Sequence, residues 1–164
     1  MERLHLKNLL HFYSMEKLNF PNYKVLLKNK ENKPYIFDRI RKKWLQHTPE
    51  EWVRAHSVQY LIETKAYPAS WILIEKEIKL YQTRKRIDVA VVDPHNNENL
   101  ILVECKAPSV KITQATFDQI ARYNLNIQSR YLMVTNGLDH YFCEMDYDQQ
   151  RYSFIKDLPK YIQK

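Results

Sequence analysis

Glycine is almost absent from this sequence, which has a single one, Gly137, in 164 residues. A phosphate-binding P-loop needs two spaced glycines, and the turn of a dinucleotide-binding fold needs three. Neither nucleotide site can be built from these residues. We therefore expect no nucleotide cofactor, and any helicase or ATPase motor that acts with this protein would be a separate subunit.

Cysteines and long apolar runs are also scarce. Cys105 and Cys143 are the two cysteines and no CxxC pair occurs, so neither a disulfide framework nor a cysteine-based zinc site is supported. No apolar run approaches the roughly 20 residues that cross a membrane. The first 20 residues carry charges inside their apolar stretch and lack a small-residue cleavage site. The sequence predicts a cytoplasmic protein without a membrane partner.

Positive charge and aromatic side chains are abundant instead. Lysine and arginine number 26 against 19 acidic residues, a net charge of +7, and aromatics make up 13% of the chain. Basic residues cluster in two places, DRIRKKW and RKR, and aromatic residues interleave with both. This mixture favours a polyanionic partner, although a merely soluble basic protein would have the same net charge. We expect DNA to contact six of these residues: Arg41, Lys42, Lys43, Arg84, Lys85 and Arg86.

The hydrophobic pattern predicts one α/β domain over residues 1–164, with residues 1–20 as an extension that is expected to be helical. One or two short strands are expected around residues 23–37. Thr48 as N-cap, Pro49 at the first helical position and Glu51 three residues after the cap predict a helix that ends near Lys65.

The rest of the chain alternates between strand and helix patterns. An amphipathic helix is predicted from Ile112, and a short helix at the C-terminus. Strands are predicted over 71–80, 86–93, 100–106, 131–137, 141–147 and 152–158. The expected architecture is a mixed central sheet flanked by helices.

The segment RIDVAVVDPHNNENLILVECK brings two carboxylates together. Two strands flank a turn-rich stretch, so an antiparallel hairpin is the simplest arrangement. Asp88 and Glu104 are equidistant from Asn96. In an unbulged hairpin they would be cross-strand partners on one face, with Cβ atoms about 5 Å apart, and Lys106 would share that face. Two acids and an ammonium suit a hard divalent cation; the alternative is an exposed strand face where a Glu–Lys pair meets Asp88 by chance.

Several motifs resemble a known nuclease group. Asp88 followed by Glu104-Cys105-Lys106 is similar to the D-Xn-ExK signature of the PD-(D/E)XK nuclease superfamily, with Ile87 in place of the proline. Gln119 and Tyr123 in DQIARY match the QxxxY helix of the branch that contains recombination exonucleases and type I restriction R subunits. Over about residues 20–155, the chain resembles the type I restriction R-protein N-terminal-like family in FDRIRKKWL, TPEEWVRAH, KRIDVAV, VECKAP, DQIARYN and VTNGL.

The resemblance implies a restriction-endonuclease-like core and a Mg2+-dependent deoxyribonuclease, expected to be an endonuclease, with Mn2+ as a substitute metal. Asp88, Glu104 and the Cys105 backbone carbonyl would bind the metal, and Lys106 would be the catalytic lysine. Glu51 would complete the metal shell.

Other roles stay open for some of these residues. With Thr48, Glu51 also forms a capping box, and Glu50 and Glu63 are alternative metal-binding acids. Gln119 and Tyr123 lie one turn apart and would line the site; the alternative is a solvated glutamine beside a core tyrosine.

Two functions are compatible with these observations. The first is a nuclease in restriction, defence or DNA processing. The second is a non-catalytic module that uses the nuclease fold to dock DNA or protein. Either would act as a homodimer or with a separate helicase or restriction subunit.

Overall fold

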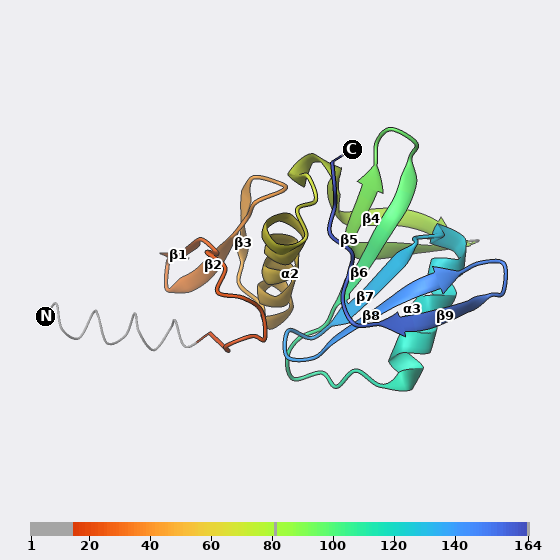
Figure 1. The fold of residues 1–164 in the computed structure, drawn as a ribbon. Coiled ribbons are helices and arrows are strands. Elements are labelled where there is room, and N and C mark those ends of the chain that lie inside the picture. Colours follow the sequence, from red (N-terminus) through yellow and green to blue (C-terminus); the bar gives the residue numbers. More distant parts are fainter. Residues whose placement is uncertain (1–14, 81, 164) are drawn as a thin grey trace, which may run out of the picture.

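The structure is a computed structural model that describes residues 15–80 and 82–163. It contains two sheets with a helix, α2 (Pro49–Gln59), between them (Figure 1). The smaller sheet is antiparallel and consists of β1 (Leu27–Lys30), β2 (Lys33–Asp38) and β3 (Lys43–Gln46). The larger sheet has the strand order β4-β5-β6-β7-β8-β9: β4 (Ile72–Leu80), β5 (Thr83–Asp93), β6 (Glu98–Cys105), β7 (Tyr131–Thr135), β8 (His140–Asp146) and β9 (Arg151–Ile155).

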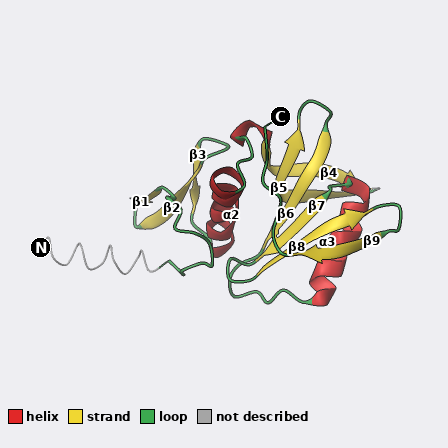
Figure 2. Cartoon of the chain, viewed as in Figure 1, coloured by secondary structure: helices red, strands yellow, loops and turns green. Residues whose placement is uncertain are grey.

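The helical segments are drawn red in Figure 2: two α-helices, a π-helical turn and a 3-10 turn (Ala69–Trp71). Local sequence signals account for both α-helices. The Thr48 hydroxyl accepts a hydrogen bond from the Glu51 backbone N at 3.1 Å, so α2 begins where the cap predicts. A π-helical turn (Tyr60–Thr64) extends it to the predicted end near Lys65. The second helix, α3 (Gln114–Ile127), is capped by Thr113 and ends at Gln128, whose φ of 56° is left-handed. In the described part of the chain, no helix has the length and apolar character that crossing a membrane requires.

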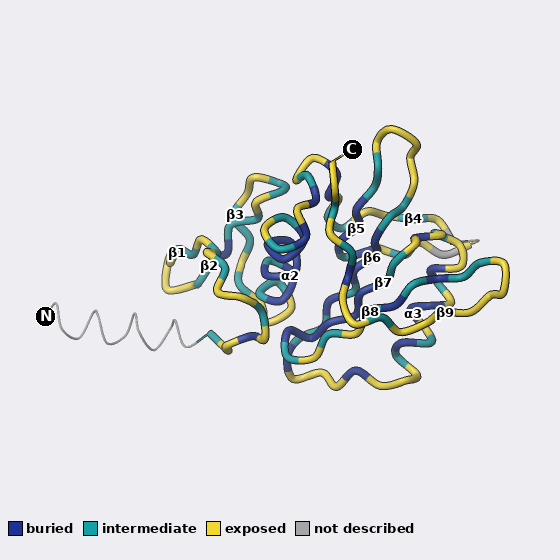
Figure 3. Tube along the Cα trace, viewed as in Figure 1, coloured by how far each residue is buried: buried dark blue, intermediate teal, exposed yellow. Residues whose placement is uncertain are grey.

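The large sheet is mixed, as the sequence predicts. β6 and β7 are parallel, with α3 as the connection between them, and every other neighbouring pair is antiparallel. The strands at the centre of the sheet are buried on both sides (Figure 3). Alternate residues of β5 and β6 divide between two cores, one toward α2 (Val89, Val91, Ile101, Val103) and one toward α3 (Ala90, Leu102). The described residues therefore form a mixed α/β fold with helices on its faces.

The two ends of the chain differ from the sequence-based predictions. Residues 156–163 contain no helix, so the predicted C-terminal helix is wrong, and the last strand ends at Ile155. Of the predicted N-terminal helix, residues 1–14 lie outside the described residues and residues 15–20 are not helical. Three short strands, rather than one or two, precede α2.

The C-terminal segment is extended because tertiary contacts hold it against the end of the α2 region. The Asp157 carboxylate accepts hydrogen bonds from the Tyr60 hydroxyl and from Lys65 Nζ, the latter at 2.5 Å. Lys65 is buried, and its backbone oxygen accepts a hydrogen bond from the Tyr161 backbone N. Leu158 fills the α2-side core beside these contacts. A helix over these residues would lose all of them.

We expect Asp157→Ala to lower the free energy of unfolding by about 2 kcal/mol, because it leaves the buried Lys65 ammonium without its carboxylate. This value is below that of a fully buried ion pair because Asp157 is half exposed. Burial by itself would raise the pKa of Asp157, but the hydrogen bonds from Lys65 and Tyr60 lower it, and the net result is a lowered pKa. The stabilisation is therefore present above the ordinary aspartate pKa and lost as pH falls through the lowered one. Thermal melts at pH 7 and pH 3 would check this. Asp148→Ala, in an exposed turn, is the control; equal melting temperatures for both variants at pH 7 would contradict it.

Candidate active site

In the β5–β6 hairpin, the strand pairs remote from the loop have the register that the sequence predicts. Val89 pairs with Val103 and Val91 with Ile101, so the next step of the ladder sets Asp88 opposite Glu104. The assumption of an unbulged hairpin is wrong, because the register shifts between Val91 and Val92. That bulge lies between the paired core and the loop. The pairs beside the loop differ by one residue from the predicted register, and the pairs beyond the bulge, next to the two acids, have it.

The Asp88 carboxylate is fixed by two donors. Its Oδ2 accepts a hydrogen bond from the Cys105 backbone N at 2.8 Å, and its Oδ1 accepts one from Arg54 Nη2 of α2 at 3.0 Å. Ile87 packs in the α3-side core and Val89 in the α2-side core, although residues two apart on a strand should share a face. The alternation is thus interrupted at Asp88, which explains why its carboxylate reaches α2.

Glu104 keeps the regular alternation and shares the α3 face with Leu102. The prediction that both acids share one flat face therefore does not describe Asp88. The two residues occupy opposed positions at the end of the paired region, and the charge of Asp88 acts on Glu104. Burial, and then that charge, raise the pKa of Glu104, while Lys85 and Lys106 act in the opposite direction. Lys106 Nζ lies 3.4 Å from Glu104 Oε1, so these two side chains are neighbours, as the sequence predicts.

Arg54 connects Glu51 to this centre. Its side chain is about 6% exposed, and its guanidinium contacts Glu51, Asp88 at 3.0 Å and Glu75 at 3.4 Å. The Glu51 carboxylate faces Arg54, and only its backbone N takes part in the Thr48 cap. Burial, opposed by the charges of Arg54 and Arg41, raises the pKa of Glu51.

The two alternative acids lie at the margin. Glu50 is half exposed and 3.8 Å from Arg54. Glu63 is 44% exposed and pairs with Arg39 at 3.2 Å. Of the three acids considered on this helix, Glu51 therefore lies deepest in the cluster.

Glu75 of β4 is a member of the cluster that sequence reasoning missed. The pairs Ile74–Val89 and Lys76–Ile87 flank it, so it stands opposite Asp88 on the neighbouring strand. Its φ of 52° is left-handed, which costs about 1–2 kcal/mol for a residue with a side chain. Arg41 holds its carboxylate at 2.5 Å, Arg54 at 3.4 Å and Arg86 at 3.6 Å. No motif marks this glutamate, since its place depends on the β4–β5 register.

Gln119 and Tyr123 lie on the α3 side, next to Lys85. Gln119 Nε2 donates to the Tyr123 hydroxyl at 3.3 Å, and Lys85 Nζ lies 3.5 Å from the centre of the Tyr123 ring. Lys85 also acts electrostatically on Glu104. The pair therefore lies beside a lysine whose charge acts on Glu104. Neither residue is buried, and Gln119 is exposed.

The six basic residues expected at DNA fall into different environments. Arg41 is engaged within the protein by Asp38 and Glu75, both at 2.5 Å. Lys42 and Lys43 are exposed where β3 begins. Arg84 and Arg86 are more than 60% exposed. Two further exposed lysines, Lys76 and Lys79, lie on β4 and line a groove of about 460 Å³. Apolar and amide side chains complete its lining: Ile78, Ile87, Ala90, Asn99, Asn126 and Ile127.

The acidic side chains of the centre are oxygen donors, the ligand type that Mg2+ uses. Within residues 15–80 and 82–163, no three His, Cys, Asp or Glu side chains are grouped so that they would hold an ion by themselves. Mg2+ uses one or two carboxylates and completes its shell with waters and substrate phosphate oxygens. Asp88, Glu104 and the Cys105 carbonyl offer oxygen ligands of that kind. Both thiols are buried, and burial raises the pKa of Cys105 well above its ordinary value, which disfavours a thiolate ligand.

Fold and site together define a mixed α/β protein with a partly buried acidic centre that is neutralised by arginines. Residues 49–159 match the family described as the type I restriction enzyme R protein N terminus. The chain belongs to this family, which confirms the family part of the resemblance. No curated protein and no solved structure matches the chain.

Proposed function

We propose that this protein is a metal-dependent nuclease of a restriction system, a PD-(D/E)XK-type deoxyribonuclease that cuts DNA as an endonuclease. The observation that carries the proposal is the placement of Asp88 and Glu104 at opposed positions at the end of the β5–β6 pairing, with Lys106 Nζ 3.4 Å from Glu104. Family membership supports it, because R proteins by their name belong to restriction enzymes.

In the proposed reaction, Asp88, Glu104 and the Cys105 carbonyl would hold Mg2+, or Mn2+ in its place, with Glu51 as a further ligand. Such an ion stabilises charge on phosphate oxygens and lowers the pKa of a bound water. The two hydrogen bonds to Asp88 fix its carboxylate before substrate arrives. Glu104 is a desolvated acid with a raised pKa, and a nearby cation would favour its charged form.

Lys106 and the α3 pair act on the substrate itself in this proposal. The Lys106 ammonium would orient the attacking water through Nζ and offset charge on the phosphate in the transition state. Gln119 and Tyr123 would hold the DNA backbone near the bond to be cut, and Lys85 lies against the Tyr123 ring. A nucleotide-driven motor would lie outside these 164 residues, and the proposal includes a restriction subunit as a partner. A homodimer is the alternative assembly.

One observation favours a second candidate, a non-catalytic docking module for DNA or protein. Arg54 already pairs with Asp88 and Glu51, and Arg41 and Arg86 pair with Glu75, so these acids have counter-ions without a metal. Digestion of plasmid and linear DNA in Mg2+, in Mn2+ and with chelator separates the two functions. Cleavage that requires the metal supports the nuclease, and nicking of closed circles identifies an endonuclease. Binding without cleavage in either metal supports the docking module.

The basic side chains of the β4–β5 hairpin should set the salt dependence of DNA binding. For Arg84→Gln/Lys85→Gln/Arg86→Gln, the slope of log affinity against log salt should fall by up to about 0.9 for each lost phosphate contact. The matched control is a triple glutamine variant at three exposed lysines elsewhere: Lys30, Lys33 and Lys156. Fluorescence anisotropy at several salt concentrations measures both slopes. An equal fall in the two variants would mean that only net charge matters.

A further inference from the structure

The guanidinium of Arg54 occupies the middle of the acidic centre. It is held from three elements: Glu51 on its own helix α2, Glu75 on β4 and Asp88 on β5. Arg54 is 5% exposed, and its Nε is buried without a hydrogen-bond partner among the described residues. A buried charge of this kind needs opposite charges around it. Arg54 is therefore the cation that these three carboxylates share, while Arg41 and Arg86 also pair with Glu75.

A divalent cation bound to Asp88 would meet this arginine directly. Asp88 Oδ2 is occupied by the Cys105 backbone N, and Oδ1 by Arg54 Nη2 at 3.0 Å. Metal ligands lie nearer, at about 2.1 Å for Mg2+, and two cations on one carboxylate oxygen repel each other. If Glu51 is also a ligand, the guanidinium stands between two of the metal's ligands, since it contacts both carboxylates.

Glu75 is a carboxylate with which the Arg54 guanidinium could pair if a metal took its place at Asp88. It already lies 3.4 Å from Arg54 Nη1, and it stands opposite Asp88 in the sheet. Its left-handed backbone, at φ 52°, aims the carboxylate at Arg41 and Arg54. Strained residues of this kind persist where the surroundings hold them and often belong to functional sites. A small movement of Arg54 from Asp88 toward Glu75 would keep the buried charge paired.

We propose that Arg54 is the resident counter-ion of this centre and that a divalent cation competes with it for Asp88 and Glu51, shifting the guanidinium onto Glu75. This inference rests on the proposed function only in that a metal binds at Asp88. It adds two positioning residues, Arg54 and Glu75, that would set the affinity for the metal. It also accounts for a centre whose acids have counter-ions without metal and can still bind one.

The test measures calcium binding by titration calorimetry and thermal unfolding with calcium or chelator. In Arg54→Gln the competing charge is gone, so calcium should bind at least about tenfold more tightly than in wild type. The same variant should melt lower than wild type in chelator and gain more from calcium, because binding to the folded state adds stability. Glu75→Gln removes the second acceptor and should weaken calcium binding several-fold. Arg130→Gln, at an exposed arginine paired with Glu144, should behave as wild type.

The outcomes separate this inference from the proposed function. Suppose that wild type binds calcium and that a folded Arg54→Gln protein binds it with equal or lower affinity. That result overturns the competition and leaves the nuclease proposal standing. If neither protein binds calcium or Mn2+, both proposals fail. Should Arg54→Gln not fold in chelator, Arg54→Lys replaces it: a lysine cannot span two carboxylates, so calcium affinity should lie above wild type, and equality with wild type would overturn the idea.

Discussion

Lys106→Ala should lose about 10²- to 10³-fold in the rate of DNA cleavage with Mg2+ while calcium binding persists. Loss of one well-placed electrostatic group in an active site typically has an effect of this size. The carboxylates of Asp88 and Glu104 remain in place, so the ligands of the proposed metal are unchanged. Because Lys106 is one of the charges that hold down the pKa of Glu104, its removal should raise that pKa further. Single-turnover cleavage with saturating protein, on single-stranded, duplex and branched DNA, measures the rate apart from binding.

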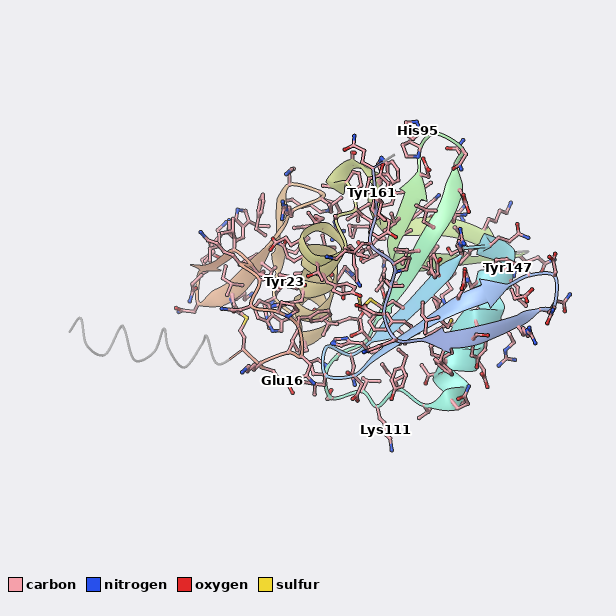
Figure 4. All side chains as sticks on the ribbon, in the orientation of Figure 1. Glu16, Tyr23, His95, Lys111, Tyr147 and Tyr161 are labelled. Carbon is pink, nitrogen blue, oxygen red and sulfur yellow. The ribbon has the colours of Figure 1, made fainter. Side chains whose placement is uncertain are left out.

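Lys111→Ala is the matched control for this experiment. Lys111 lies five residues further along, in the loop before α3, and its side chain projects away from the protein (Figure 4). The Lys111→Ala substitution removes one positive charge, as Lys106→Ala does, but it leaves the acidic centre unchanged. Cleavage by Lys106→Ala at the rate of Lys111→Ala would show that Lys106 is structural and that the nuclease is not at this centre.

The register of β5 and β6 could be predicted because it is a local property. A single turn-rich loop joins two adjacent strands, so only a few registers are open to the hairpin. The pairs beside the loop, Val92–Asn99 and Asp93–Glu98, are one residue away from the register centred on Asn96, and the bulge at Val91/Val92 brings the pairs beyond it into that register. The start of α2 is local for the same reason, since Thr48, Pro49 and the Glu51 backbone N are adjacent in the chain. Both predictions needed only neighbouring residues.

The arginine network could not be predicted because it depends on contacts between distant segments. Arg41 comes from the turn between β2 and β3, Arg54 from α2 and Glu75 from β4, and their meeting requires the docking of the small sheet and of α2 on the large one. The interruption at Asp88 is also invisible in the sequence, since RIDVAVVD alternates regularly. The C-terminal helix failed as a prediction because Asp157 and Leu158 gain more from Lys65, Tyr60 and the core than from a local helix.

The small sheet thereby takes part in the site as well as in the core. Asp38, at the end of β2, accepts hydrogen bonds from the backbone N atoms of Ile40 and Arg41 and pairs with the Arg41 side chain. This fixes the turn so that Arg41 reaches Glu75 across the structure at 2.5 Å. The DRIRKKW segment, expected from the sequence to contact DNA, thus has one arginine turned inward and two exposed lysines, Lys42 and Lys43, facing solvent.

Asp88→Asn should weaken calcium binding by at least about tenfold, because a metal-ligating carboxylate loses its charge while the side chain keeps its shape. The amide oxygen can still accept the hydrogen bond from the Cys105 backbone N, so the hairpin should remain folded. Arg54 loses one of its partners, and a lower melting temperature in chelator is expected from this less balanced buried charge. The pKa of Glu104 should fall toward its ordinary value, since the charge of Asp88 is one of the causes that raise it.

Calorimetry with calcium and a pH titration of Glu104 by NMR measure both effects of Asp88→Asn, and Asp148→Asn in the exposed β8–β9 turn is the control. A metal site at Asp88 requires the two results together. Weaker calcium binding with an unchanged pKa of Glu104 would mean that the two acids do not share one centre, because the charge of Asp88 would then not reach Glu104. Calcium binding equal to that of wild type would show that Asp88 only anchors Arg54 and the Cys105 backbone. The proposed metal site would then be wrong.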